Sequence, residues 1–120
     1  MEELRLRLYM MDMLGLIEHG NGDKILEILK HDGYIKSNIL ADLLDRHHFE
    51  LLRVIEGRTF RRHGEIQKEK GLIDTFKECD LNPRFFLRDS EYRNSRGQEF
   101  HCYECKPLMV GLIVGRIRIS

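Results

Sequence analysis

The sequence predicts an α+β fold that is mostly helical and carries a β-hairpin toward its C-terminal end. Two observations predict it: apolar residues recur at helical spacing through residues 2–55, and shorter strand-like segments follow through residues 85–103. A chain of 120 residues with 42% hydrophobic content is long enough for one packed core and too short for two ordinary domains. We therefore expect a single domain over residues 1–120.

The first expected helix covers residues 1–18 and is unusually apolar. Leu4, Leu8, Met11 and Ile17 form a stripe, and further leucines and methionines widen it onto a second side. Such a helix packs on the core with one side and on a second copy with the other, or it is a short helix buried within one chain. The first alternative predicts a homodimer.

Two further helices are expected before residue 45. Asp23 follows a glycine-rich turn and is suited to cap a helix that ends before Gly33. After a brief extended link, Ser37 is suited to cap a helix from Asn38 to about Leu44. A break at residues 45–46 separates this helix from the next one.

The middle of the chain is predicted to be a helix and a connector. Helical spacing restarts at His47 and continues until Gly57 offers a stop. Residues 58–71 are polar and punctuated by glycine, which predicts a connector that is partly helical from Glu65. The apolar residues at 72–76 extend that helix or begin another before Asn82 and Pro83 break the chain.

The C-terminal part shifts to strand patterns. Short strands are expected at residues 85–87, 91–93 and 99–103, and the turn at 94–97 makes a hairpin with a basic tip. A final apolar run from residue 108 to 114 contains glycine, which weakens a helix there without excluding it. Residues 116–119 alternate as a short strand or a frayed end does.

Two short helices separated by a tight turn and followed by a β-hairpin are the outline of a winged helix-turn-helix. In that arrangement the second helix enters the major groove of DNA and the hairpin, or wing, reaches neighbouring phosphates. The residues predicted to bind double-stranded DNA are Ser37, Arg46, His47, His48, Glu50 and Arg53 from the helices and Arg93, Asn94 and Arg96 from the hairpin. A solvated surface without a ligand is the alternative for the two histidines and the hairpin tip.

Two separated stretches, residues 37–55 and 85–103, carry a pattern known from one family. The first has a Ser-initiated helix before a basic-His motif, in which His48 is the matching histidine, and a Leu-x-x-x-Ile helix. The second has a Phe, a Ser-x-Tyr segment, a turn with glycine and a later Tyr. Over roughly residues 35–115 the chain thus resembles the Rha family of phage regulatory proteins.

The resemblance implies a winged helix-turn-helix regulator that acts in phage lysogeny or host interaction. Two features depart from the family pattern. From Lys106 onward the chain lacks the Gly-Phe-rich helix and longer helical tail of that family, and the helix of residues 1–18 is not part of the pattern. These departures leave room for an altered partner or oligomeric state.

The charge of the chain is balanced overall and uneven along its length. The formal net charge is +0, which gives no support to nucleic-acid binding by the molecule as a whole. Residues 1–45 carry five Lys/Arg against nine Asp/Glu, whereas residues 46–120 carry fifteen against eleven. Basic character therefore gathers in the second part, where it can orient the protein toward phosphate.

Composition and motifs argue against several other classes of protein. Cys79, Cys102 and Cys105 are an odd number without a disulfide framework, and with no signal peptide or membrane span visible we expect a cytoplasmic protein in a bacterial host cell. Cys102 and Cys105 have the spacing of a zinc knuckle, but the chain has no second Cys pair, so free thiols are favoured over a metal. Without a nucleophile elbow, phosphate loop or His-Glu-x-x-His motif, we expect neither an enzyme nor a cofactor.

Two functions from different classes remain after these exclusions. The first is a sequence-specific DNA-binding transcriptional regulator or antirepressor. The second is a phage-encoded inhibitor that uses the same scaffold to bind a host protein, such as a repressor or a CRISPR-type defence complex. The neutral net charge and the acidic Glu50 and Glu56 within the second helix favour the second alternative. The operator, the sign of regulation and the identity of a host partner are left open.

Overall fold

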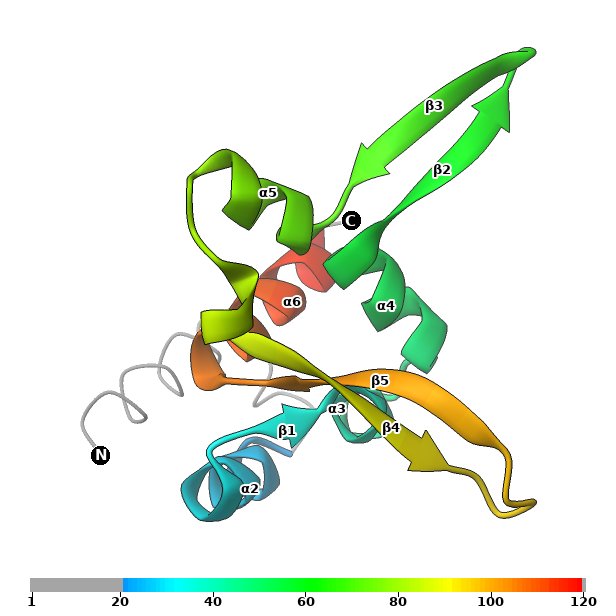
Figure 1. Ribbon diagram of the computed structural model, residues 1–120. Helices are drawn as coiled ribbons and strands as arrows, with labels where there is room; N and C mark the ends of the chain where they lie inside the picture. Colours follow the sequence, from blue (N-terminus) through cyan, green and yellow to red (C-terminus); the bar gives the residue numbers. More distant parts are fainter. Residues whose placement is uncertain (1–20, 120) are drawn as a thin grey trace.

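The computed structural model describes residues 21–119 and shows an α+β fold with two small antiparallel sheets (Figure 1). The predicted helix of residues 1–18 lies outside the described residues, so the homodimer inferred from it stays a prediction. The elements are, in order, α2 (Gly22–Asp32), β1 (Ile35–Lys36), α3 (Ser37–Leu43), α4 (His48–Glu56), β2 (Gly57–Arg62), β3 (Glu65–Lys70), α5 (Leu72–Glu78), the 3-10 turn η2 (Pro83–Phe85), β4 (Leu87–Arg93), β5 (Glu99–Cys105) and α6 (Pro107–Ile119).

The predicted C-terminal hairpin forms, but it belongs to a larger sheet. Strand β5 is the centre of a three-stranded sheet with the order β1-β5-β4. Cys105 pairs with Ile35 on one side and with Leu87 on the other, and the β4–β5 register runs to Arg93 opposite Glu99. The hairpin is therefore held at its base by the short strand that precedes α3, and α6 follows it.

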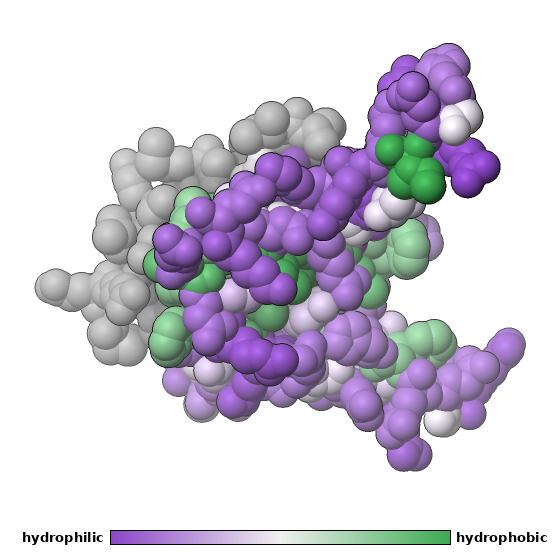
Figure 2. Space-filling model, turned by 45° about the horizontal axis from the view of Figure 1, so that its top comes forward, coloured by the Kyte–Doolittle hydropathy of each residue, from purple (hydrophilic) through white to green (hydrophobic). Residues whose placement is uncertain are grey.

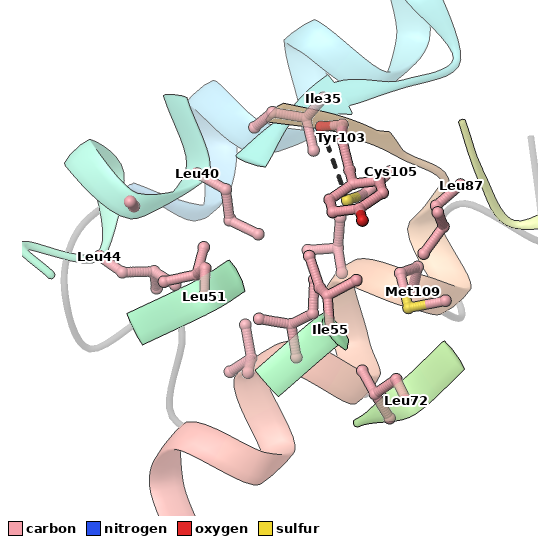
Figure 3. Packing of buried hydrophobic residues seen from close by; sticks show 14 of the residues in the cluster. Ile35, Leu40, Leu44, Leu51, Ile55, Leu72, Leu87, Tyr103, Cys105 and Met109 are labelled. Carbon is pink, nitrogen blue, oxygen red and sulfur yellow. Dashed lines mark hydrogen bonds between the residues drawn. The ribbon is translucent and has the colours of Figure 1, made fainter. Parts of the chain in front are cut away.

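One cluster of buried apolar side chains joins the helices to this sheet (Figure 3). Leu40 comes from α3, Leu51 and Ile55 come from α4, and all three are fully buried. From α6 the cluster takes residues 109, 110, 113 and 114, which lie on one side of a helix. Burial of this face favours a helix despite the two glycines. Helix α6 continues to Ile119, so the predicted strand or frayed end at 116–119 was wrong.

Helix ends were predicted well where glycine closes them. Gly33 (φ 69°) ends α2 in the left-handed conformation, and Gly57 (φ 78°) follows α4. The predicted N-caps were less accurate. Asn21, not Asp23, occupies the N-cap of α2, and Lys36 occupies that of α3, because the side chain of Ser37 has other partners.

The prediction of a partly helical connector over residues 58–71 was wrong. Strands β2 and β3 form a second antiparallel hairpin there, which projects away from the body of the protein (Figure 1). We call this hairpin, Gly57–Lys70, the arm. His63 (φ 53°) and Gly64 (φ 79°) both have positive φ, as the two-residue hairpin turn of type I′ requires. Because every side chain of β3 is exposed, no apolar alternation marks the strand in the sequence.

Two glycines cross at the base of the arm and set its position. Gly57 begins β2 directly after the last residue of α4, and Gly71 follows the end of β3. A Cβ atom added to Gly71 would lie 2.3 Å from the backbone nitrogen of Gly57 and 2.4 Å from the carbonyl oxygen of Ile55. The backbones are thus in close contact, and the arm leaves α4 at one defined place.

We predict that Gly71→Ala destabilises the fold by about 1–3 kcal/mol, because the added methyl group meets backbone atoms that have no room to move. Chemical denaturation measures the free energy of unfolding. Gly111→Ala is the matched control, since a Cβ atom there meets nothing within 4 Å. The control lies in α6 and is expected to gain up to about 1 kcal/mol from helix propensity. Equal effects of the two substitutions would contradict the prediction.

Candidate nucleic-acid interface

Helix α4 lies between the two hairpins and presents one side to solvent (Figure 1). Its buried residues Leu51 and Ile55 are one turn apart and face the core. The opposite side carries Phe49, Arg53 and Glu56, which are spaced by four and three residues and so lie on one stripe. The hairpins project on either side of this helix and leave a hollow between them, which Figure 2 also shows.

The tight turn before α4 places the predicted basic residues near its start. Asp45 has a positive φ of 55°, which short polar side chains tolerate, and Arg46 and His47 follow it as exposed residues. Arg46 Nη1 lies 3.3 Å from Glu50 Oε2, so each partly neutralises the other. Arg53 is half-buried and has no ion-pair partner within residues 21–119.

The predicted contact Ser37 lies inside the core and joins three elements. Its side chain is 0% exposed, and its Oγ lies 2.7 Å from His48 Nε2 at the start of α4. The same Oγ accepts a 3.0 Å hydrogen bond from the backbone N–H of Tyr103 in β5. Ser37 therefore has no exposed surface with which to contact DNA, contrary to the prediction.

His48 continues this network toward the β4–β5 hairpin. Its Nδ1 lies 3.4 Å from the Tyr92 hydroxyl, and the two rings meet edge to face with centroids 5.5 Å apart. The Tyr92 ring stacks in turn on Phe100 of β5. Both ring nitrogens of His48 therefore have partners within the protein, and the half-buried ring connects the start of α4 to the hairpin.

The end of α4 is attached to the same strand. The hydroxyl of Tyr103 donates a 2.8 Å hydrogen bond to Glu56 Oε2, the last residue of the helix. Burial, and then this carboxylate, raise the pKa of Tyr103 well above its usual range. Tyr103 thus holds α4 at both ends, through its backbone nitrogen by way of Ser37 and through its side chain directly.

We predict that Ser37→Ala lowers the free energy of unfolding by about 1–3 kcal/mol, because it leaves the buried N–H of Tyr103 without its partner. Thermal or urea denaturation is the measurement. Ser95→Ala is the matched control, since Ser95 is exposed at the tip of the β4–β5 hairpin. If both variants have the same free energy of unfolding as the original protein, the hydrogen bonds of Ser37 do not stabilise the fold.

The pKa of His48 is lowered from 6.5, first by burial and then by the nearby His101. The folded protein therefore binds this proton less readily than the unfolded chain does, and the associated stability is present above pH 6.5 and is lost as the pH falls below it. We predict that the melting temperature falls more between pH 7.5 and pH 5.5 than that of His48→Gln. Because the remaining histidines are common to both proteins, parallel pH profiles would rule out this role for His48.

The tip of the β4–β5 hairpin is less basic than predicted. Arg93 Nη2 lies 3.0 Å from Glu99 Oε1, and Asn94 Oδ1 accepts hydrogen bonds from the backbone of Arg96 and Gln98. From Leu87 to Cys105 the hairpin carries three arginines against four carboxylates. Arg96 is the one arginine of this hairpin for which the described part of the chain shows no ion pair.

The arm contains the basic cluster that sequence reasoning missed. Residues 57–70 carry five Lys/Arg against two Glu, which is a net charge of +3. The register separates these charges, because directly opposed residues share a face. One face holds Thr59, Arg61, Ile66, Lys68 and Lys70, and the other holds Arg58, Phe60, Arg62, Glu65, Gln67 and Glu69. The first face has three cations and no carboxylate of its own.

The cations near the base of the arm form ion pairs, whereas those at its tip have none among the described residues. Lys68 lies 3.6 Å from Asp74 and Lys70 lies 2.5 Å from Glu78, both in α5. On the other face Arg58 lies 2.8 Å from Glu69 and covers the ring of Phe60. Toward the turn, Arg61, Arg62 and His63 are exposed and have no ion pair among the described residues.

A shallow groove of about 330 Å³ lies where α4 meets the arm. Its lining is Phe49, Leu52, Arg53, Glu56, Gly57, Arg58, Thr59 and Phe60. Phe49 is 70% exposed, which is unusual for an aromatic residue at the front of a helix. The groove joins the exposed stripe of α4 to the arm as one continuous surface.

The cysteines lie apart from this surface chemistry. Cys102 and Cys105 are buried in β5, and burial raises the pKa of both thiols, that of Cys105 to about 12, whereas Cys79 is exposed. In the described part of the chain, no three His, Cys, Asp or Glu side chains are arranged to hold a metal ion. The helices between residues 21 and 119 also include none with the length and apolar character needed to cross a membrane.

Comparisons with family models, curated proteins and solved structures find no match to this chain.

Proposed function

We propose that the chain is a DNA-binding regulator of the winged helix-turn-helix type, in which α3 and α4 are the two helices and the β4–β5 hairpin is the wing. The observation that carries the proposal is the exposed side of α4, which lies between two hairpins that project from the body on either side of it (Figure 1). A recognition helix has to be buried on one side and open on the other. Leu51 and Ile55 meet the first condition, and the exposed Phe49 and Glu56 on the other side meet the second.

The resemblance to the Rha pattern supports the proposal and sets its context as phage regulation. The Ser and His of that pattern, Ser37 and His48, are hydrogen-bonded to each other and connect the two helices to the sheet. A pair of this kind supports a common scaffold better than a common ligand. Whether the chain activates, represses or acts as an antirepressor depends on its operator and its partners.

The contacts that we propose are four of the residues predicted from the sequence. Arg46, His47 and Arg53 lie on α4 or directly before it, and Arg96 lies at the tip of the wing. Glu50 lowers the effective charge of Arg46, and Glu56 is held by Tyr103. The positive field of α4 is therefore weak, and the proposed helix depends on hydrogen bonds to base edges as well as on charge.

The proposal predicts that the protein enriches a sequence motif from a random pool of duplex DNA. Binding to the selected duplex is expected to weaken steeply with salt, because arginines that contact phosphates release counterions. Arg53→Ala should reduce affinity by about 1–3 kcal/mol and relax the preference at one base position. Fluorescence anisotropy measures the affinity.

Lys30→Ala is the matched control for this experiment, since Lys30 is an exposed cation on α2, away from α4 (Figure 1). It is expected to bind the selected duplex like the original protein. The assignment of the site is wrong if Arg46→Ala, Arg53→Ala and Arg96→Ala all bind with the original affinity. Failure to enrich any motif would remove sequence-specific recognition from the proposal.

A second candidate function is an inhibitor that binds a host protein, and Phe49 is the observation that favours it. This 70% exposed ring lies in the same groove as Phe60, and an aromatic residue in such a place is a typical protein-protein anchor. The candidate predicts a nuclease-resistant complex with a repressor or a CRISPR-type effector, lost in Phe49→Ser. If Phe49→Ser keeps that complex, or if only DNA is recovered, the regulator is the better proposal.

A further inference from the structure

From the structure we infer that the arm is a second DNA-contacting element, which binds the phosphate backbone through the cations at its tip. The inference rests on the proposed DNA binding and assigns its main electrostatic contact to a segment that the winged helix-turn-helix pattern does not include. It replaces the β4–β5 tip as the expected centre of charge attraction.

The distribution of charge identifies the kind of ligand. The arm carries a net charge of +3, whereas the β4–β5 hairpin, with three arginines and four carboxylates, is slightly acidic. Near the turn Arg61 and Arg62 are exposed and have no ion pair within residues 21–119. Glu65 lies opposite Arg62 on one face, whereas Arg61 lies opposite the apolar Ile66 on the other. Exposed cations of this kind on a chain of zero net charge are matched by a polyanion, and phosphates of duplex DNA supply one negative charge about every 1.7 Å.

The shape of the arm suits contact with a duplex. Each strand has six residues, so the arm extends roughly 20 Å from its base at about 3.4 Å per residue. This reach exceeds the width of the major groove, which is about 12 Å. With α4 in the major groove, an arm of this length reaches a phosphate strand on the groove's far side.

The base of the arm gives it a fixed starting point relative to α4. The arm begins at the residue after the helix ends, and the backbones at Gly57 and Gly71 are in close contact. Arg116 strengthens this junction, since its Nη1 donates a 3.1 Å hydrogen bond to the Lys70 carbonyl and its Nη2 lies 3.2 Å from Thr75 Oγ1. A contact made by the tip is therefore coordinated with one made by the helix.

Ile66 adds a contact that charge alone does not explain. It is 70% exposed and pairs directly across the hairpin with Arg61, so an apolar group stands beside a cation on the cationic face. An apolar side chain next to arginine is a combination found on proteins that press against the sugar edges and bases of a groove. The arm thus offers both a charge and a small apolar surface to the same ligand.

The test compares two double variants that lose the same charge from different places. Arg61→Gln with Arg62→Gln removes the tip cations, and Lys24→Gln with Lys30→Gln removes two exposed cations of α2. The probes are the duplex selected by the full-length protein and an unrelated duplex of equal length. Affinity is measured by anisotropy over a range of NaCl concentrations.

We expect the affinity of the arm variant to fall for both duplexes by a similar factor. We also expect the slope of log K against log salt to become shallower by about 2, one for each lost phosphate contact. The α2 variant should keep the original slope. Circular dichroism and thermal melting of each variant establish that the loss does not come from unfolding.

The outcomes separate the inference from the proposed function. Equal losses in the two double variants, or an unchanged slope in the arm variant, overturn the arm contact while DNA binding stands. If the original protein binds neither duplex even at low salt, the proposed function fails and the inference fails with it.

Discussion

The position of α4 depends on Tyr103. The backbone N–H of this residue donates to Ser37 Oγ, which in turn lies 2.7 Å from His48 at the start of the helix. Its hydroxyl donates to Glu56 at the helix end. These bonds lie in or next to the core, where a polar group without a partner is costly, so they specify one orientation of the helix against the sheet. The two hairpins, which continue from α4 or contact its start through Tyr92, take their directions from that orientation.

The same network includes two residues, Ser37 and His48, that the sequence pattern assigns to DNA contact. In the sequence, Ser37 and His48 look like the polar ends of two DNA-binding helices. In the structure they bond to each other, and Ser37 is completely buried. The groups that remain for the proposed recognition of DNA are fewer and lie further out, on the exposed stripe of α4 and at the hairpin tips. The arm, with a net charge of +3, lies beside α4 rather than on it.

A feature could be predicted from the sequence where the residues that form it lie close together along the chain. Gly33 and Gly57 mark the C-terminal ends of α2 and α4, and periodic apolar residues were enough to place the helices around residues 25–55. The Ser37 bond to Tyr103 spans 66 residues, and no local pattern reports such a contact. The Arg93 pair with Glu99 was within reach, because the turn at 94–97 places these residues across the hairpin. The arm was not predicted because its side chains bury almost no surface and so show no apolar alternation, although the His63-Gly64 pair marks its turn.

The arm contributes no side chain to the buried cluster that holds the described part of the chain together. Substitutions along β3, whose side chains are all exposed, therefore change what the arm touches without changing how the core packs. The buried cluster of the described residues is in this way formed by segments other than the arm. A change in the length or charge of the arm is therefore expected to leave the packing of α4 against the sheet as it is.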